Sequence, residues 1–324
     1  MAVMTYLEAI ADGLREAMRA DPSVILLGED VAAYGGAFKL TKGFLEEFGP
    51  SRVIDTPISE AGIVGAAVGA ALVGLRPVAE MQFADFISNA FNQIVNVAAT
   101  SAYRVGGCVP LVVRAPCGAG THGGPFHSQS VEAYFFHTPG LKIVLPATPA
   151  DAKGLLLSAI ADPNPVLYLE HKALYRSQRG AVGEGLTLVP LGKGEVRRPG
   201  RDVSVITYGM MVHRCLEAAE AAAQEGVDAE VIDLRTLLPL DLEILADSVT
   251  RTSRALIVHE DRLRGGIGAE IAAYVGEHFF TALDAPICRV GAPDTPVPYA
   301  PPLEAAYLPS ADRIRHAIVH LARW

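Results

Sequence analysis

The stretch from Arg52 to Val73, RVIDTPISEAGIVGAAVGAALV, contains the unit from which this fold is built. Its short β-branched run, Arg52–Ile54, predicts a strand, and a polar turn that ends at Ser59 follows it. Ser59 can cap a helix that runs from Glu60 to about Val73 and is rich in alanine and glycine. A strand, a polar turn and a helix in succession are typical of α/β proteins.

The same alternation extends through the first half of the chain. Five further apolar runs predict strands, at Val24–Leu27, Pro77–Met81, Leu111–Arg114, Lys142–Leu145 and Val166–Leu169. A capping box at Thr5 and Glu8 predicts the start of one helix, and Thr148 followed by Pro149 predicts the start of another. Apolar strands that alternate with helices predict a parallel sheet with both faces covered.

A polar, glycine-containing stretch from about Arg176 to Gly200 interrupts this alternation, which then begins again. Four more strands are predicted, at Val203–Thr207, Ala229–Ile232, Ala255–His259 and Ile287–Val290. We therefore expect a first domain over residues 1–180, a linker over residues 181–200 and a smaller α/β domain over residues 201–324. A length of 324 residues fits two domains of about 150 residues each.

Composition narrows the class of function. The net charge is −9 and the basic residues are scattered, which argues against a nucleic-acid partner. Four cysteines without Cys-x-x-Cys spacing indicate free thiols in a reducing compartment. The longest apolar run, Ile63–Leu75, is too short and too rich in glycine for a membrane span, and no secretory signal is evident. We expect a cytoplasmic protein with no membrane partner. Only 19% of residues are charged, which suggests that partner chains cover part of the surface.

Several common sites of α/β enzymes are missing from the sequence. It contains no G-x-x-x-x-G-K-[ST] for a phosphate-binding loop and no G-x-G-x-x-G after a strand. The nucleophile motif G-x-S-x-G and the zinc motif H-E-x-x-H are also absent. An enzyme with this sequence must therefore hold its cofactor in another way.

Four segments that follow predicted strands carry the polar residues of interest. They are Gly28-Glu29-Asp30, Asp55 to Glu60, Glu80 to Phe86, and the glycine-rich loop from Arg114 to Ser130. Ligand sites in parallel sheets lie at the carboxyl ends of the strands. The order of these segments predicts one site at that edge.

Taken together, these segments resemble the beta subunit of the 2-oxo acid dehydrogenase decarboxylating component, a family that includes the pyruvate, branched-chain 2-oxo acid and acetoin enzymes. The resemblance extends over nearly the whole chain and includes Arg76-Pro77, Pro139 to Lys142, Asp151 to Leu155, Asp233 to Thr236 and Asp294 to Pro298. It implies a parallel-sheet domain of the pyrimidine type that binds thiamine diphosphate. A smaller transketolase C-terminal-like α/β domain is then expected to follow.

The resemblance also implies which residues bind the cofactor: Glu29, Ile58, Ser59, Glu60, Gln82 and Phe86. Glu60 would hydrogen-bond a ring nitrogen of the aminopyrimidine and so act as a positioned acid–base group. Glu29 would be a second carboxylate nearby and would raise the proton affinity of the pair. For Glu60 the alternative is a first-turn glutamate that only favours the helix N-terminus, and for Phe86 it is ordinary core packing.

His127 follows the glycine-rich loop, and the resemblance places it on the substrate side of the cofactor. Glycines allow such a loop to bring a side chain over a ligand. His127 could there stabilise or shuttle protons for the reacting adduct and assist acylation of the lipoyl group. We therefore predict two catalytic residues, Glu60 and His127.

One further segment is similar to a stretch that binds potassium in some relatives. The implied ligands, mostly backbone carbonyls, are Leu111, Ala159, Ile160, Asp162 and Asn164. Hard cations accept such oxygen shells. The alternative is a plain Asp-Pro-Asn turn before a strand.

The sequence lacks the Gly-Asp-Gly motif that holds the diphosphate and Mg²⁺ in this superfamily. A diphosphate without these ligands would bind poorly, so another polypeptide must complete the site. The resemblance implies an alpha chain that holds most of the Mg²⁺ shell, an assembly of two alpha and two beta chains, and a lipoyl acyltransferase core.

The predicted function is oxidative decarboxylation of a small 2-oxo acid, pyruvate or a branched-chain acid, with acyl transfer to lipoamide. The alternatives are the beta subunit of an acetoin dehydrogenase and a non-catalytic scaffold subunit of the same complex. A self-sufficient thiamine enzyme such as a transketolase is disfavoured by the missing diphosphate ligands.

Overall fold

The computed structural model describes residues 1–324, which form two compact units. The first unit contains Met1–Cys117 and Tyr134–Leu191, and the second contains Gly118–Ala133 and Gly192–Trp324. The glycine-rich loop after Cys117 therefore groups with the second unit, whereas the sequence suggested that it belongs to the first domain. The stretch 181–200 is not wholly irregular, since it includes the end of one strand and the whole of another.

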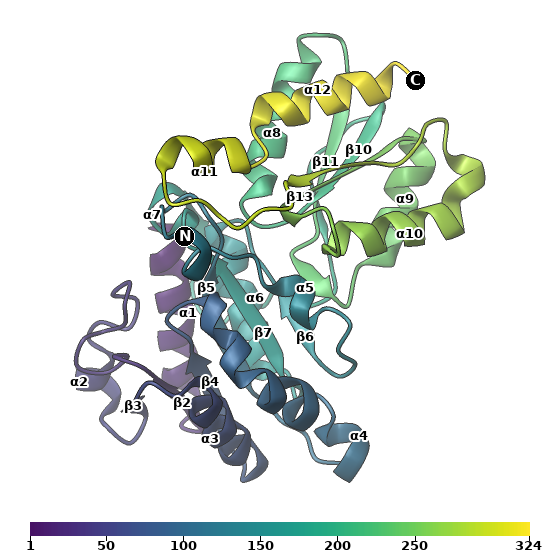
Figure 1. Ribbon diagram of the computed structural model, residues 1–324. Coiled ribbons are helices and arrows are strands. Elements are labelled where there is room, and N and C mark those ends of the chain that lie inside the picture. Colours follow the sequence, from purple (N-terminus) through teal and green to yellow (C-terminus); the bar gives the residue numbers. More distant parts are fainter. The chain divides into compact units, whose positions relative to one another are not determined.

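The first unit is an α/β layer structure (Figure 1). Its strands are β1 (Ala2–Thr5), β2 (Val24–Gly28), β3 (Val53–Asp55), β4 (Arg76–Glu80), β5 (Val112–Cys117), β6 (Lys142–Val144), β7 (Val166–His171) and β8 (Arg179–Val182). Its helical segments are α1 (Tyr6–Ala20), α2 (Phe44–Phe48), α3 (Glu60–Leu72), η1 (Ala84–Ala90), η2 (Gln93–Ala98), α4 (Ser101–Val105), α6 (Pro149–Ala161) and α7 (Leu174–Ser177). Helix α5 (Glu132–Phe135) lies in the chain where the second unit's loop returns to the first unit.

The strands of the main sheet in this unit run in the order β6-β7-β5-β4-β2-β3, and each of these pairs is parallel. All six strands predicted for this domain are present. A small antiparallel ladder between β1 and β8 was not predicted from the sequence. It pairs residues nearly 180 positions apart, such as Ala2 with Val182, so no local pattern could indicate it.

Local signals explain two of the helices well. Thr5 and Glu8 form the predicted capping box, because each side chain accepts the backbone N–H of the other. Thr148 caps α6 by accepting the N–H of Asp151 at 3.2 Å, and Pro149 occupies the first helical position. Both helices begin where the sequence predicts.

The predicted cap of α3 is wrong in one respect. Ser59 stands before the helix, but its side chain makes no capping hydrogen bond. Its backbone, at φ −164° and ψ 80°, departs from the extended conformation of a regular cap. The hydroxyl instead lies over Gly62, where a Cβ atom would come within 2.9 Å of it.

The second unit is a smaller α/β layer structure. Its strands are β9 (Glu195–Arg198), β10 (Val203–Thr207), β11 (Ala229–Asp233), β12 (Thr236–Leu238), β13 (Ala255–Arg262) and β14 (Cys288–Ala292). Its helical segments are η3 (Gly124–Phe126), α8 (Met211–Ala223), α9 (Leu242–Thr252), α10 (Ile267–Phe279), η4 (Phe280–Ala282), α11 (Pro301–Tyr307) and α12 (Ala311–Ala322). The sheet order is β14-β13-β10-β11-β9, with only β9 antiparallel to its neighbour.

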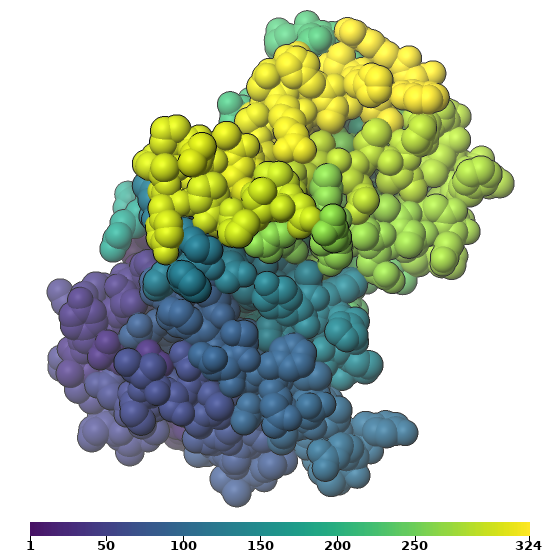
Figure 2. Space-filling view, viewed as in Figure 1, coloured from purple at the N-terminus to yellow at the C-terminus, as the bar shows by residue number.

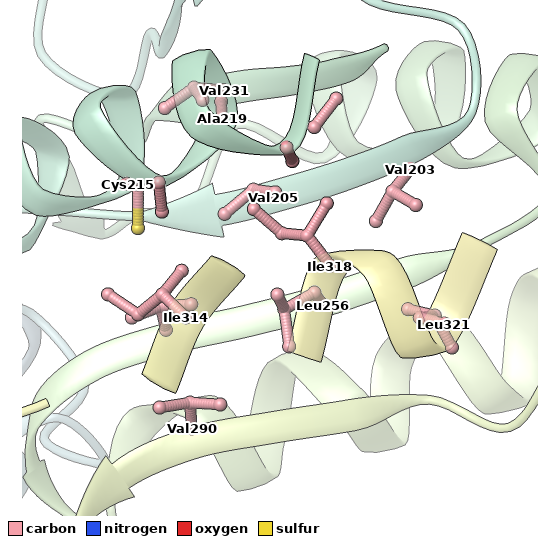
Figure 3. Close-up of a cluster of buried hydrophobic side chains, with 14 of the residues drawn as sticks. Val203, Val205, Cys215, Ala219, Val231, Leu256, Val290, Ile314, Ile318 and Leu321 are labelled. Atoms are coloured by element: carbon pink, nitrogen blue, oxygen red, sulfur yellow. The ribbon is translucent and has the colours of Figure 1, made fainter. Parts of the chain in front are cut away.

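Helices cover both faces of this second sheet, with α8 and α12 together on one side (Figure 1). Figure 3 shows the core beneath them, where apolar side chains of these two helices meet those of the strands. The residues drawn there include Cys215, Ala219, Ile314, Ile318 and Leu321 from the helices and Val203, Val205, Val231, Leu256 and Val290 from the strands. None of the helices is long and apolar enough to cross a membrane.

Candidate functional site

The carboxyl ends of three neighbouring strands form the edge at which the predicted residues gather. Gly28, the last residue of β2, is paired with Asp55 of β3 on one side and with Glu80 of β4 on the other. The chain leaves these three strand ends toward Glu29, Glu60 and Gln82. The parallel register therefore brings the three segments to one edge of the sheet, as ligand sites in this class of fold require.

Two carboxylates lie close together at this edge. Glu60 is the first residue of α3, is buried, and accepts a hydrogen bond from Nδ2 of Asn89 at 3.2 Å. Glu29 is also buried, and burial raises the pKa of its carboxyl group, with the negative charges of Glu60 and then Asp30 adding to the effect. Like charges in a poorly solvated site favour retention of a proton. Glu29 therefore retains a proton more readily than an isolated exposed glutamate.

The other four residues of the predicted cofactor site differ in their exposure and in their contacts. Nε2 of Gln82 donates to Asp30 at 3.2 Å, next to Glu29 in the chain. Phe86 lies in η1 and packs edge-on against Phe83, with ring centroids 5.9 Å apart. Ile58 is 84% exposed and Ser59 is exposed as well. An isoleucine left open beside buried carboxylates is suited to contact with a ligand or a partner chain.

Asn89 was missed from the sequence. It lies on η1, three residues after the Glu80-to-Phe86 segment, and contacts Glu60 across 29 residues of chain. The side chain has no local motif that would predict this role. Its position after the Gln82-to-Phe86 segment is the only available signal.

A buried ion group behind this edge was also missed. Arg114 of β5 forms ion pairs with Glu80 of β4 and Glu170 of β7, and all three side chains are almost wholly buried. The hydroxyl of Tyr175 donates to Glu170 at 2.6 Å. Burial raises the pKa of Glu80, even though the Arg114 guanidinium acts in the opposite direction. Charged residues within apolar strands are seldom buried unless they are paired, so the three strand sequences did contain a usable signal.

His127 lies in the second unit, whereas the carboxylate pair lies in the first. It follows the short turn η3 and is half-buried, and Ser128 after it is buried. The loop is closed at its base because the N–H of Gly118 donates to the carbonyl of Gln129 at 3.1 Å. Within one loop of the second unit, His127 therefore occupies a defined position.

Comparison with known proteins decides the family. The model of the transketolase pyrimidine binding domain matches residues 2–178, and that of the transketolase C-terminal domain matches residues 192–314. The chain is 49% identical to the 2-oxoisovalerate dehydrogenase subunit beta of Bacillus subtilis over 100% of both chains. The chain belongs to the beta subunits of 2-oxo acid dehydrogenases. The resemblance identified from the sequence is confirmed.

Two other relatives in this beta-subunit family have a similar sequence identity to the chain. The pyruvate dehydrogenase E1 component subunit beta of Bacillus subtilis is 45% identical over 96% of each chain. The acetoin:2,6-dichlorophenolindophenol oxidoreductase subunit beta of Cupriavidus necator is 47% identical, over 95% of this chain and 94% of the relative. These similar values do not favour one substrate over another.

Solved structures confirm the fold expected of a beta subunit. The structure titled "Split gene transketolase, inactive beta4 tetramer" has a TM-score of 0.80 at 25% identity and covers 99% of each chain. A transketolase of Pichia stipitis has a TM-score of 0.75 at 15% identity, and this chain spans 46% of its length. The predicted transketolase-like fold class is therefore confirmed.

Several oxygens of the turn predicted to bind potassium already have partners within the chain. Nη1 of Arg76 donates to the carbonyl of Ile160 at 2.7 Å and to that of Asp162 at 3.4 Å. The Asp162 carboxylate forms an ion pair with Lys142 and accepts the N–H of Asn164 at 2.9 Å. The carbonyl of Leu111 accepts a strand hydrogen bond at 2.8 Å. The chain's own cations and N–H groups thus contact oxygens of three of the five predicted ligands, Leu111, Ile160 and Asp162.

Proposed function

We propose that this chain supplies the pyrimidine half of a thiamine diphosphate site in a 2-oxo acid dehydrogenase, and that Glu60 is its acid–base group. The observation that carries the proposal is the buried Glu60 carboxylate at the start of α3, beside Glu29. A family model named for pyrimidine binding covers the residues concerned. The enzyme would oxidatively decarboxylate a 2-oxo acid in the cytoplasm and transfer the acyl group to lipoamide.

The residues at this edge fit an aminopyrimidine ring. A carboxylic acid that retains its proton can hydrogen-bond a ring nitrogen, and the raised pKa of the neighbouring Glu29 keeps a proton available in the pair. Phe86 and Ile58 offer apolar surface for a flat ring. When bound, thiamine diphosphate supplies a carbon nucleophile that attacks the keto group of the substrate.

Each residue of the proposed site then has a distinct role. Glu60 holds a proton at the ring nitrogen and takes it back as the protonation state of the ring changes. Asn89 orients the Glu60 carboxylate through the hydrogen bond to Oε2. Gln82 fixes Asp30, and therefore the turn that carries Glu29, and Ser59 lines the rim beside Ile58. His127 would assist proton transfer on the substrate side.

The charged tail of the cofactor requires another chain. No Gly-Asp-Gly motif occurs in the sequence, and no cluster of potential metal ligands occurs in the structure. An alpha subunit would therefore hold the diphosphate and most of the Mg²⁺ shell, in an assembly of two alpha and two beta chains. The exposed Ile58 marks the rim at which the two half-sites would meet. The complex would dock onto a lipoyl acyltransferase core.

Replacing Glu60 tests the proposal directly. Glu60→Gln keeps the shape of the side chain but removes the exchangeable proton, so kcat of the assembled alpha–beta enzyme should fall by about 100-fold or more. Assembly, measured by size-exclusion chromatography, should be unchanged. Glu270→Gln is the matched control, because Glu270 is an exposed glutamate in the first turn of α10. Turnover by Glu60→Gln at the wild-type rate would favour a non-catalytic scaffold subunit.

Two further measurements separate the remaining alternatives. The chain without an alpha subunit should not decarboxylate any 2-oxo acid, and activity in its absence would favour a self-sufficient thiamine enzyme. Steady-state rates of the assembled enzyme on pyruvate, 2-oxoisovalerate and acetoin then identify the substrate. A kcat/KM highest for acetoin would assign the chain to an acetoin dehydrogenase.

A further inference from the structure

The loop that carries His127 is bound at several points to the rest of the second unit. Oε1 of Glu260 on β13 accepts the N–H of Ala119 at 2.6 Å. Near the loop's end, the hydroxyl of Tyr208 donates to Glu132 at 3.0 Å. The ring of Tyr299 lies against Gly124, where a Cβ atom would come within 2.2 Å of it. These contacts come from several parts of the second unit, so the loop's conformation depends on its tertiary packing.

Glu304 makes the densest set of these contacts. Its Oε1 accepts the N–H of Gly120 at 3.0 Å and that of His122 at 3.2 Å. Its Oε2 lies 2.7 Å from Nδ1 of His122 and 3.3 Å from the His122 N–H. Both carboxylate oxygens of one buried side chain therefore bind the same short segment of loop.

The position of Glu304 is set by helix α11. The helix begins with two prolines and lies at the surface of the second unit, in the yellow part of Figure 2. Leu303 on this helix is 61% exposed, while its neighbour Glu304 points inward and is 1% exposed. A buried carboxylate is costly unless it is hydrogen-bonded. The loop supplies those hydrogen bonds.

The loop's backbone explains why such contacts are needed. Gly118, Gly120, His122 and Gly124 all have positive φ, and at His122 the value is 60°. A left-handed conformation costs a non-glycine residue roughly 1–2 kcal/mol. Such a residue keeps this conformation only where its surroundings impose it. At His122 the surroundings are the carboxylate of Glu304, which binds both its backbone and its ring.

We propose that Glu304 is a positioning residue that sets the conformation of the loop carrying His127, acting through Gly120 and His122. This inference rests on the proposed function only where it predicts that replacing Glu304 lowers turnover. The effect of Glu304 on the conformation of the loop does not depend on a catalytic role of His127. Glu304 and His122 would thus have no direct contact with the substrate, but they would hold the following residues in place for it.

The loop offers a direct probe of its own order. Phe126 is 64% exposed and precedes His127, so chymotrypsin can cleave there only as fast as the loop opens. Glu304→Gln replaces one acceptor oxygen by an NH₂ group facing the donors of His122. Cleavage after Phe126 in the full-length chain should become about tenfold faster, which corresponds to the loss of one charge-assisted hydrogen bond. Glu277→Gln, at an exposed glutamate of α10, should have no effect.

Turnover of the assembled enzyme provides the second measurement. Glu304→Gln should lower kcat about tenfold and change KM for the 2-oxo acid less than about threefold, because His127 acts on the reacting group after binding. A general loss of folding would instead lower the amount of active enzyme and the melting temperature. If Glu304→Gln does not fold, His122→Ala replaces it, since this change removes only a half-exposed ring.

The outcomes separate the two proposals. Unchanged cleavage and unchanged kcat in both Glu304→Gln and His122→Ala overturn the inference. If His127→Ala abolishes turnover while Glu304→Gln retains it and leaves cleavage after Phe126 unchanged, the inference fails and the proposed function stands. If His127→Ala retains turnover, the proposed role of His127 fails, and faster cleavage in Glu304→Gln still supports the control of the loop by Glu304.

Discussion

Replacing Glu132 by glutamine should stabilise the second unit, and the gain should grow as pH rises. Glu132 is 1% exposed; its Oε1 accepts the hydroxyl of Tyr208, and its Oε2 has no hydrogen-bond partner in the structure. Burial raises the pKa of Glu132 to about 8, and the negative charge of Asp261 adds to the effect. Glutamine has the same shape and carries no charge, so it avoids the cost of burying a carboxylate.

The number of protons bound by the folded and the unfolded states determines how the stability changes with pH. The folded state keeps the Glu132 proton up to about pH 8, whereas the unfolded chain releases it near the ordinary pKa of 4.5. Between these values the folded state binds more protons, so the free energy of unfolding falls as pH rises. The stabilising contribution is complete below pH 4.5 and is lost above pH 8. At about 1.4 kcal/mol per pH unit, the interval corresponds to roughly 5 kcal/mol.

A second buried group changes with pH in the opposite sense. Burial lowers the pKa of His259 to about 4, so the unfolded chain binds more protons between that value and the ordinary 6.5. Stability from His259 therefore increases as pH rises through this window. Because wild type and Glu132→Gln share His259, its contribution cancels when the two are compared at each pH.

Urea unfolding at pH 5, 7 and 9 measures the effect. Unfolding is followed by far-ultraviolet circular dichroism, because Trp324, the only tryptophan, is 64% exposed at the end of the chain and its fluorescence would change little. The two proteins should differ by about 1 kcal/mol or less at pH 5, and the variant should be more stable by about 3–5 kcal/mol at pH 9. Tyr208→Phe is the companion variant and should destabilise the wild type modestly at each pH. A stability difference that stays constant across pH would refute the reasoning.

Two other predictions concern the first unit. Arg114→Met leaves Glu80 and Glu170 buried without their counter-ion, so urea unfolding should show a free energy of unfolding lower by about 3–5 kcal/mol. The control Arg179→Met, at an exposed arginine, should change the same quantity by less than about 0.5 kcal/mol. Exchanging sodium for potassium at equal ionic strength should not change the melting temperature, because Arg76 and Lys142 occupy the oxygens of the turn at Asp162. An ion bound at 100 times its dissociation constant would add about 2.7 kcal/mol, and a corresponding rise in melting temperature in potassium would contradict this prediction.

Local patterns in the sequence were sufficient for most of the strands and for the starts of two helices. The β-branched runs before Glu29 and Glu60 predicted the strands β2 and β3, and the capping residues Thr5 and Thr148 predicted the starts of two helices. Such features depend on residues only a few positions apart, and backbone propensities act at that range. The motif order along the chain was enough to recognise the family, which the comparisons confirm.

Only the tertiary structure decided which residues distant in the chain contact each other. Glu304 meets His122 across 182 residues, and Arg76 reaches the carbonyl of Ile160 across 84. The same packing assigns the His127 loop to the second unit. These pairings depend on strand order and on which faces of the elements meet. A pattern of short period carries no information about either, so the sequence by itself predicted which polar groups follow the strand ends, and the folded chain determined what holds them in place.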